Sequence, residues 1–477
     1  MVPDTILSPA TNMASNVTPI PALDPIPIDW PFDLTALHRL NPSRYPCLLE
    51  SVAEGSELSR YDLLFAFPQA SLRLNPDFSL SGQDSTADSR FLAAFDHWFA
   101  REAAPQAADT GLPFTGGWFV VLGYELAYQI EPTLDLGARP DGPVALAVRI
   151  PVTVIRDRLD RRAWIAAEPG YEAEVGQILE DLDNLRAGHA ASPEPGTDAV
   201  ILEDELVVDD PDDFIGAVRR AQRHIEAGDI FQANLSRQWH GKLKPGIRPV
   251  DIYARLRRYN PAPFAGLAVF DDFAVVSSSP ERLLRMSGDR IETRPIAGTR
   301  PRTSPGRDDA PRRAELLKNP KERAEHIMVI DLERNDLGRI CCAGSVTVDE
   351  YMVVESYSHV HHIVSNIAGR PIENAAPGDI IAAIFPGGSI TGCPKVRCME
   401  IIAELEGRPR GVYTGAMGYI NRDGSGDLSI LIRCMTIQGR ALSFATGCGS
   451  VTDSDPEQEL AETLAKAKGL ILALTSS

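Results

Sequence analysis

The pattern of apolar and polar positions is most regular from residue 210 onward. In DDPDDFIGAVRRAQRHIEAGD the apolar residues Phe214, Val218 and Ile225 recur with the spacing of one helical face. Asp210 precedes this pattern as a capping residue, and Gly228 follows it where a helix commonly ends. The pattern therefore predicts a helix from 211 to about 227.

The next segment changes from a helical period to alternation. In IFQANLSRQW, residues 230–239, the polar residues Gln232, Asn234 and Ser236 alternate with apolar ones. Successive side chains of a strand point to opposite faces of the sheet, so these three polar side chains share one face. We expect a strand that presents a polar row to another part of the molecule.

Capping residues predict further helices. NPKERAEHIMVIDLERNDLG has Asn319 as its cap and Gly338 after its predicted end, and DPEQELAETLAKAKGLILAL has Asp455 as its cap. The turn in PGGSITGCPK leads into a helix from about Pro394, whereas YTGAMGYI, LSILIRCMTI and ALSFATGCGSV are typical of strands. Strands mixed with helices, without strict alternation, favour an α+β fold over a doubly wound fold.

Composition divides the chain into four regions. Residues 1–30 are rich in proline and are expected to form a loose lead, and residues 31–182 combine short alternating runs with glycine and proline turns. Residues 183–208 begin with a stretch rich in Ala, Ser, Pro and Gly that has no apolar period, and we interpret them as a linker. Residues 209–477 carry the patterns described above.

The overall charge excludes some classes of partner. The chain has 47 Lys and Arg against 66 Asp and Glu, a formal net charge of -19, so neither nucleic acid nor an acidic membrane is expected as its main partner. No segment approaches the roughly 20 apolar residues that cross a bilayer. The seven cysteines are scattered and include no C-x-x-C pair, which argues against a disulfide framework and a zinc ribbon and indicates a cytoplasmic protein.

Two glutamates on separate predicted helices are candidates for a metal site. Glu325 and Glu462 each have apolar neighbours in the sequence, and Mg²⁺ prefers a few carboxylates together with water and an anionic substrate group. However, Glu462 and Lys466 are spaced i, i+4 and could form an ordinary surface ion pair. Spacing alone leaves both interpretations open.

Candidate groups for proton transfer occur at two places. His361 and His362 in SHVHHIVSN fit either a strand with one buried, hydrogen-bonded ring or a proton carrier near neutral pH. Glu281 in SSSPERLL follows a proline at a predicted strand end. There it is either a rigidly held general acid or the partner in a salt bridge on the Arg282 side.

Groups suited to an anionic ligand occur in two further segments. Tyr413, Arg433 and the turn from Gly447 to Gly449 offer a phenol, a guanidinium and backbone N–H groups, which suit a carboxylate. The stretch RPIAGTRPR, residues 294–302, places three arginines around the small Ala297, and we expect it to form a loop that faces an anion.

From about residue 210 to 470 these segments resemble the chorismate-utilising enzymes. The resemblance rests on long motifs in order: GDIFQANLS, SSSPER, RPIAGTR, RAEHIMVIDLERNDLGR, PGGSITGCPK, YTGAMGYI and DSDPEQELAETLAKAK. The N-terminal half, with LLES and GGWFVVLGYELA, is similar to the N-terminal region of the large subunits of anthranilate synthase and aminodeoxychorismate synthase. The resemblance implies large intertwined antiparallel sheets flanked by helices, with the catalytic region in 209–477.

The resemblance also implies roles for individual residues. Glu325 and Glu462 would bind Mg²⁺ against the ring carboxylate of chorismate, Glu281 would protonate the departing hydroxyl, and His362 would assist at the ring or pyruvyl side. The residues implied to hold the carboxylates of the substrate are Gly298, Thr299, Tyr413, Arg433, Gly447, Gly449 and Lys466.

The nucleophile separates the members of this family. Relatives that form isochorismate use a lysine base where this chain has Gln232, so water is disfavoured and ammonia is expected. Asn234 and the NPAPFAGL and PGGSITG runs resemble aminodeoxychorismate synthase component I. Ala297 instead matches the PIAGT form of anthranilate synthase, because many aminodeoxychorismate synthases have lysine there.

From the three motifs we expect 4-amino-4-deoxychorismate as the product, for p-aminobenzoate and folate. Anthranilate synthase component I and an inactive chorismate-binding scaffold are the alternatives. The chain has no recognisable amidotransferase segment, so a separate glutamine amidotransferase subunit would supply the ammonia. The resemblance finally implies a candidate effector pocket at Ser51, Pro263, Phe264 and Ala265, where relatives hold tryptophan, although LLES could simply be a packed strand end.

Overall fold

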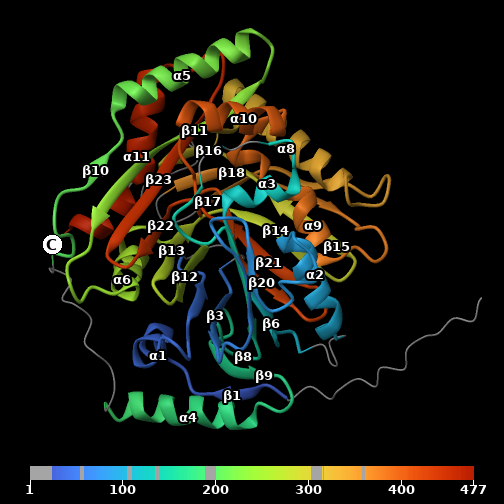
Figure 1. The fold of residues 1–477 in the computed structure, drawn as a ribbon, viewed down its shortest axis with the longest axis vertical. Coiled ribbons are helices and arrows are strands. Elements are labelled where there is room, and N and C mark those ends of the chain that lie inside the picture. The colour runs from blue at the N-terminus through green and yellow to red at the C-terminus, as the bar shows by residue number, and fades with distance from the viewer. Residues whose placement is uncertain are drawn as a thin grey trace, which may run out of the picture.

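Two large antiparallel sheets form the centre of the molecule in this computed structural model (Figure 1). The structure describes residues 24–53, 59–104, 110–134, 137, 139–188, 200–301, 314, 316–356 and 360–476. All strand pairs recorded for these residues are antiparallel, and helices cover the outer faces of the sheets. The predicted α+β fold with large antiparallel sheets flanked by helices is confirmed.

The first sheet contains twelve strands. Their spatial order is β1 (Ile26–Ile28), β9 (Arg162–Ala167), β8 (Val152–Asp157), β3 (Tyr61–Ala66), β2 (Cys47–Glu50), β12 (Phe264–Phe270), β13 (Phe273–Ser279), β22 (Cys434–Gln438), β23 (Ala441–Ser450), β11 (Gln232–Lys242) and β10 (Val207–Val208), with β19 (Gly392–Cys393) also paired to β11.

The second sheet contains eleven strands. Their order is β16 (Ile296–Pro301), β18 (Val360–Gly369), β15 (Arg290–Arg294), β14 (Arg282–Ser287), β21 (Gly426–Ile430), β20 (Ala416–Asn421), β6 (Gly117–Leu122), β7 (Ala145–Ile150), β4 (Ser71–Leu74) and β5 (Leu80–Gly82), with β17 (Thr347–Ser356) paired to β18. In both sheets strands of the N-terminal region pair with strands of the C-terminal region, as in β2 with β12 and β6 with β20.

The helices occupy the outer faces of this pair of sheets. They are α1 (Leu34–Leu40), α2 (Phe91–Glu102), α3 (Ala127–Ile130), α4 (Glu172–Arg186), α5 (Pro211–Glu226), α6 (Pro249–Tyr259), α8 (Pro320–Gly338), α9 (Pro377–Ile384), α10 (Lys395–Glu406) and α11 (Pro456–Thr475), with short 3-10 turns η1 (Tyr124–Leu126) and η2 (Gly388–Ile390). Figure 1 shows α5, α10 and α11 around β11 and β23, and α4 at the opposite end below β1. Within the described ranges, no helix combines the length and apolar character of a transmembrane span.

The apolar core is divided by the sheets into separate clusters. Phe65, Phe119 and Val275 belong to a cluster between the two sheets, because they come from strands of both. Leu34, Tyr253 and Leu470 are part of a second cluster that packs α1, α6 and α11 on the outer face of the first sheet, and α2, α8 and α9 cover the second sheet. The helices are therefore fixed by burial of one face against a sheet.

The predicted helix caps are present. The side chain of Asp210 accepts a hydrogen bond from the N–H of Asp212 at 2.8 Å, and that of Asp455 accepts one from Gln458 at 2.9 Å. The only difference in α8 is at its end, since Gly338 is its last residue and not the residue after it. These helices begin where short-range capping chemistry predicts.

Three predictions about irregular segments are wrong in part. The N-terminal lead was predicted to be loose, but its residues Ile26–Ile28 form strand β1, which pairs with β9. This strand lies at an edge of the sheet, where a proline such as Pro27 is tolerated. Residues 1–23 lie outside the described part. The predicted linker is also partly regular, because helix α4 extends into it as far as Arg186 and strand β10 occupies the end of the linker. Residues 189–199 of the linker are not described.

The stretch RPIAGTRPR was predicted to be a loop, but its residues Ile296–Pro301 form a strand. It forms β16, paired with β18, with a register shift between Ala297 and Thr299. Gly298 has φ +68°, which is the conformation that lets a bulge interrupt the pairing without ending the strand. Residue 302 lies outside the described part.

Candidate active site

The glycines of β23 form one wall of the candidate site. Gly447 pairs with Ser236 and Gly449 with Asn234 across β11. A Cβ at Gly447 would lie 2.8 Å from both the Tyr413 hydroxyl and Asn234 Oδ1, and 2.5 Å from the carbonyl oxygen of Leu235. Only a residue without a side chain therefore allows the phenol and the amide to approach this strand.

The polar row of β11 lies over the same glycines. A Cβ at Gly449 would lie 2.1 Å from Gln232 Nε2, so the Gln232 side chain rests directly on this residue. Gln232 Oε1 and Asn234 Oδ1 are buried and have no hydrogen-bond partner among the described residues. Two amide oxygens are thus available for a bound molecule, and the predicted polar row of this strand is confirmed.

Helix α11 brings a lysine and a glutamate to this wall. Lys466 Nζ donates a hydrogen bond to the carbonyl oxygen of Gly447 at 3.0 Å and pairs with Glu462 Oε1 at 2.7 Å. The i, i+4 ion pair foreseen from spacing is present, with both side chains partly exposed. The pair lies at the site rather than on a remote surface, because its lysine contacts the β23 glycine.

Glu281 is held at the end of β13 in a nearly closed environment. It is 5% exposed, and its Oε1 accepts hydrogen bonds from Ser389 Oγ at 2.7 Å and from the N–H of Ile296 at 3.3 Å. Burial raises its pKa to about 7, although these hydrogen bonds and the charges of Arg433 and Lys466 oppose the shift. A carboxyl that is half protonated at neutral pH is suited to act as a general acid.

The alternative interpretation, in which Glu281 forms a salt bridge on the Arg282 side, is wrong. Arg282 instead binds Asp427 through two hydrogen bonds of 2.9 Å each, and its guanidinium lies over the ring of Phe264. The strand alternation explains this outcome, because neighbouring residues at the start of β14 point to opposite faces.

Arg433 contributes a half-buried guanidinium close to Glu281. It lies between β21 and β22 with φ +51°, a conformation that non-glycine residues adopt at some energetic cost and that occurs often at functional sites. Burial lowers its pKa, and Glu281 opposes this shift. The backbone carbonyl of Arg433 accepts a hydrogen bond from Ser278, but no hydrogen bond or ion pair of its guanidinium is recorded among the described residues, so this charge is available for an anion.

The histidine pair lies on β18, with both rings buried. His361 Nδ1 lies 2.7 Å from Ser356 Oγ, whereas the ring of His362 hydrogen-bonds to the backbone of Gly298 on the neighbouring β16. Burial, followed by the charge of Arg433, lowers the pKa of His362 to about 3. His362 is therefore a neutral ring at neutral pH.

The centre of β16 is close to helix α8. A Cβ at Gly298 would lie 2.8 Å from Glu322 Oε2, and Ala297 is half-buried beside it. Thr299 pairs with His362 through the backbone. The nearby Arg294 does not face a free anion, since it pairs with Glu355 at 2.6 Å and with Glu350 at 2.5 Å.

The two candidate metal ligands come from different helices. Glu325 is half-buried on α8, one turn after Glu322, and Glu462 is on α11, one turn before Lys466. Within the described ranges, no group of three or more His, Cys, Asp or Glu is close enough to hold an ion by itself. Two carboxylates completed by water and by a substrate carboxylate fit the ligand preference of Mg²⁺.

Two residues beside the candidate acid were not predicted from the sequence. Ser389 orients Glu281, and Glu333 on α8 is a buried carboxyl that receives a hydrogen bond from the N–H of Gly388 at 3.1 Å. The glycine-rich PGGSITG motif was the available signal for Ser389. No local pattern distinguishes Glu333, because its burial arises from packing between α8 and η2.

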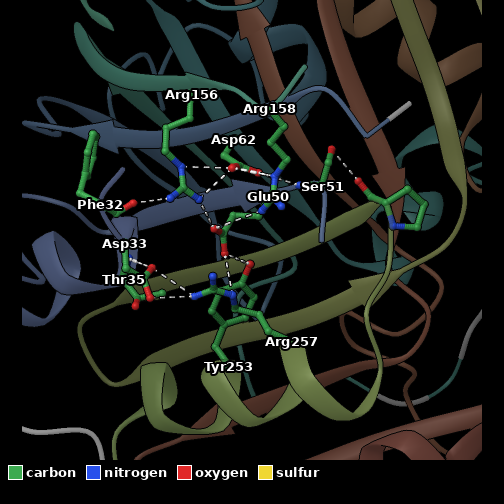
Figure 2. A network of polar contacts seen from close by, with 11 residues as sticks. Phe32, Asp33, Thr35, Glu50, Ser51, Asp62, Arg156, Arg158, Tyr253 and Arg257 are labelled. Atoms are coloured by element: carbon green, nitrogen blue, oxygen red, sulfur yellow. Dashed lines mark hydrogen bonds and ion pairs between the residues drawn. The ribbon is translucent and has the colours of Figure 1, made fainter. Parts of the chain in front are cut away.

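The structure also brings the four candidate effector residues together at the start of β12. Ser51 Oγ donates to the carbonyl oxygen of Pro263 at 3.1 Å (Figure 2). Phe264 and Ala265 follow on β12. Beside them Glu50 pairs with Arg156 at 2.8 Å and Arg257 at 3.3 Å in a buried network. Whether these residues bind an effector stays a prediction.

Comparison with known proteins gives a consistent result. The family model described as chorismate binding enzyme matches residues 47–472. The chain is 35% identical to anthranilate synthase component 1 of Synechocystis sp., over 94% of this chain and 96% of that protein. It is 36% identical to aminodeoxychorismate synthase of Streptomyces griseus, over 83% of this chain but 55% of that protein.

A solved structure agrees with these relatives. The crystal structure of anthranilate synthase component I from Streptococcus pneumoniae matches with a TM-score of 0.74 and 29% identity, covering 87% of this chain and 93% of that one. The extent of the family match, and the relative that is similar over nearly its whole length, decide the classification: this chain belongs to the chorismate-binding enzyme family.

Proposed function

We propose that the chain is the chorismate-binding component of an anthranilate synthase-type enzyme. It would add ammonia at C2 of chorismate, release the C4 hydroxyl as water, and then eliminate pyruvate to leave anthranilate. The observation that carries this choice is Ala297, whose methyl group offers no amine for an adduct at the ring. The relatives similar over most of their length that are named anthranilate synthase support it.

This proposal corrects the product expected from the three sequence motifs. Those motifs favoured aminodeoxychorismate synthase, but the relative of that name is matched over only 55% of its length. Amination at C4 remains the second candidate because Asn234 in FQANLS lies at the β23 glycines, where it can contact a bound ring.

The charged and polar groups around β23 would bind the dicarboxylate. Arg433, Lys466 and the Tyr413 hydroxyl supply donors, and Gly447, Gly449, Gly298 and Thr299 supply backbone at close approach. Glu281, held by Ser389, would donate its proton to the leaving hydroxyl at C4. The neutral His362 would assist at the ring or pyruvyl side through a hydrogen bond.

Glu325 and Glu462 would hold Mg²⁺ together with the ring carboxylate. When bound, this ion would supply positive charge that stabilises the anion developing on the substrate. Glu462 would exchange its contact with Lys466 for the ion, which would leave the lysine for a substrate carboxylate. The expected outcome for Glu325→Gln and Glu462→Gln is a rise in the Mg²⁺ concentration needed for half-maximal activity.

The nitrogen would come from a separate glutamine amidotransferase subunit. Ammonia needs no base once it arrives unprotonated, which suits a site with Gln232 in place of a lysine. Addition of such a subunit from the same cell is expected to make glutamine a nitrogen source. If none confers glutamine dependence, the partner part of the proposal fails.

Product identification tests the reaction itself. Purified protein is incubated with chorismate, Mg²⁺ and an ammonium salt, and anthranilate fluorescence and pyruvate are followed. Both are expected. Consumption of chorismate without either, followed by p-aminobenzoate after addition of aminodeoxychorismate lyase, would instead favour C4 amination. Unchanged chorismate in all assays would favour the inactive scaffold.

A further inference from the structure

A second buried carboxyl lies close to Glu281 without a role in the reaction described above. Glu333 is 3% exposed and comes from α8, whereas Glu281 comes from the end of β13. The turn η2 joins them, because the Gly388 N–H donates to Glu333 Oε1 at 3.1 Å and the Ser389 hydroxyl donates to Glu281 Oε1 at 2.7 Å. Consecutive residues of one turn therefore bind the two carboxyls.

Glycine at residue 388 favours the close approach of the turn to α8. A Cβ at Gly388 would lie 3.1 Å from Leu332 Cβ and 3.2 Å from Glu333 Oε1. These distances are tighter than ordinary van der Waals contact, so a side chain would push the turn away from the helix. Close packing thus fixes Glu333 relative to Ser389.

Among the residues that the structure describes, no Lys or Arg forms an ion pair with Glu333. Its Oε2 is buried and has no hydrogen-bond partner among the described residues. The nearest lysine, Lys395, donates hydrogen bonds to Asp336 and to the carbonyl oxygen of Ile384, so its charge is largely committed to Asp336. The carboxylate of Asp336, which is the partner of Lys395, adds negative potential at Glu333.

Two carboxyls in one buried environment compete for ionisation. The charged groups that act on Glu281 are Arg433 and Lys466, and those that act on Glu333 are, in order of size, Asp336, Lys395 and Glu281. Since the repulsion between two carboxylates is mutual, a charged Glu333 also acts on Glu281. Burial raises the pKa of both carboxyls to about 7, and the charge of Glu281 is among the causes that raise it for Glu333. Since like charges repel, ionisation of one carboxyl favours the protonated form of the other.

We propose that Glu333 is a positioning residue that keeps Glu281 protonated and holds the Gly388–Ile390 turn that orients it. The carboxylate of Glu333 makes ionisation of Glu281 unfavourable, and its hydrogen bond to Gly388 fixes the Ser389 hydroxyl against the catalytic carboxyl. The inference rests on the proposed function in one respect, namely that Glu281 acts as the acid.

The substitution Glu333→Gln separates charge from hydrogen bonding. The amide oxygen can still accept from Gly388, but the negative charge is removed. Glu281 should then lose its proton more easily, and the alkaline limb of kcat/KM for chorismate should move to lower pH by roughly half a unit or more. Asp331→Asn is the matched control, because it removes an exposed charge from the same helix and should leave the limb unchanged.

A direct titration makes the test independent of turnover. The carbonyl band of protonated carboxyl groups is followed by infrared spectroscopy between pH 5 and pH 9 in wild type and in Glu281→Gln. By reciprocity, Glu333 should titrate at lower pH once Glu281 is neutral. This measurement does not require Glu333→Gln to fold, and it needs no substrate.

Two results would overturn the inference. One is an alkaline limb in Glu333→Gln that superimposes on wild type or moves to higher pH. The other is an infrared titration of Glu333 that is the same in wild type and in Glu281→Gln. A wild-type protein that consumes no chorismate would count against the proposed function instead, and the infrared comparison would still decide the coupling.

Discussion

Ser389 and Glu281 are 108 positions apart in the sequence, yet the serine hydroxyl donates a 2.7 Å hydrogen bond to the glutamate carboxyl. The contact joins the turn η2 to the end of β13 in a buried environment. It stabilises the ionised form of Glu281 and so moderates the rise in pKa that burial causes. The proton affinity of the candidate acid therefore depends on a segment far away in the chain.

Removal of this hydroxyl should shift the pH profile upward. In Ser389→Ala the ionised form of Glu281 loses a donor, so its pKa rises above about 7 and the protonated acid persists to higher pH. The alkaline limb of kcat/KM for chorismate should move to higher pH, opposite to the shift expected for Glu333→Gln. We also expect kcat/KM to fall by about tenfold, the effect of one hydrogen bond to a charged group.

The control for this experiment is Ser345→Ala. It removes a hydroxyl that donates to the carbonyl oxygen of Cys342 at 2.7 Å, away from Glu281. Its pH profile should match wild type. An alkaline limb that moves to lower pH in Ser389→Ala would show that the hydroxyl does not stabilise the ionised carboxyl.

Arg433 should be more important for binding than for stability. Its guanidinium has no ion-pair partner among the described residues, so replacement by methionine removes a costly unpaired charge. We expect Arg433→Met to keep or slightly raise the free energy of unfolding, and to raise KM for chorismate by about 10- to 100-fold, as for loss of one charge-assisted contact. Urea unfolding and steady-state kinetics measure the two effects. A loss of stability with unchanged KM would contradict this assignment.

The two glycines of β23 should respond differently to alanine. A Cβ at Gly447 would meet the backbone oxygen of Leu235 at 2.5 Å, which cannot move without disturbing the sheet. A Cβ at Gly449 would instead meet the end of the Gln232 side chain, which can rotate away. We therefore expect Gly447→Ala to lower the free energy of unfolding by about 2 kcal/mol or more, and Gly449→Ala to cost less but to weaken chorismate binding.

Gly216 provides the matched control for these substitutions. It lies inside α5, where the nearest atom to an added Cβ is Arg220 Nη1 at 3.6 Å. Gly216→Ala should raise the free energy of unfolding by up to about 1 kcal/mol through helix propensity. Equal losses at Gly447 and Gly449 in urea unfolding would show that the distinction between backbone and side-chain contacts is wrong.

Local chemistry made much of the fold predictable. The caps at Asp210 and Asp455 each act within three residues, so the sequence alone contains both the donor and the acceptor. The strand β1 was missed because its partner β9 lies far along the chain. The strand β16 was missed because prolines and a glycine read as a loop, although a bulge at Gly298 accommodates them in the sheet.

The site was predictable only where a recognisable motif carried it. Tyr413, Gly447 and Lys466 were singled out from separate motifs, and the structure places them around one strand. Their convergence depends on the pairing of β11 with β23 and on the packing of α11, which no local pattern contains. The environment of Glu333 was not predictable at all, because a glutamate in a polar helix looks exposed until the helix is placed against η2.

The ion pair between Glu406 and Arg410 should stabilise the fold around the candidate site. Glu406 Oε1 accepts from Arg410 Nη2 at 2.7 Å and from the N–H of Ser236 at 2.8 Å, and Arg410 donates to the backbone oxygens of Asn234 and Ile390. The buried pair thereby joins α10, β11 and η2. Arg410→Met would leave the carboxylate of Glu406 buried without its main partner, which costs about 3–5 kcal/mol of unfolding free energy.

The pH dependence of this loss follows from the sign of the pKa shift. Burial alone would raise the pKa of Glu406, but Arg410 and Arg408 outweigh it and hold the pKa below its ordinary value. The pair therefore stabilises the fold above the unfolded pKa of about 4.3, and this contribution is lost as the pH falls through the folded value. In urea unfolding, the difference between wild type and Arg410→Met should be larger at pH 7 than at pH 3.

A second ion pair on α10 serves as the control. Arg397 and Glu400 lie 2.7 Å apart, but both side chains are exposed, so Arg397→Met should cost less than about 1 kcal/mol at either pH. The double variant Arg410→Met with Glu406→Leu should recover part of the loss, because no buried charge is then left unpaired. Equal costs for Arg397→Met and Arg410→Met would show that burial does not distinguish the two pairs, and that Glu406 and Arg410 do not hold β11 in place.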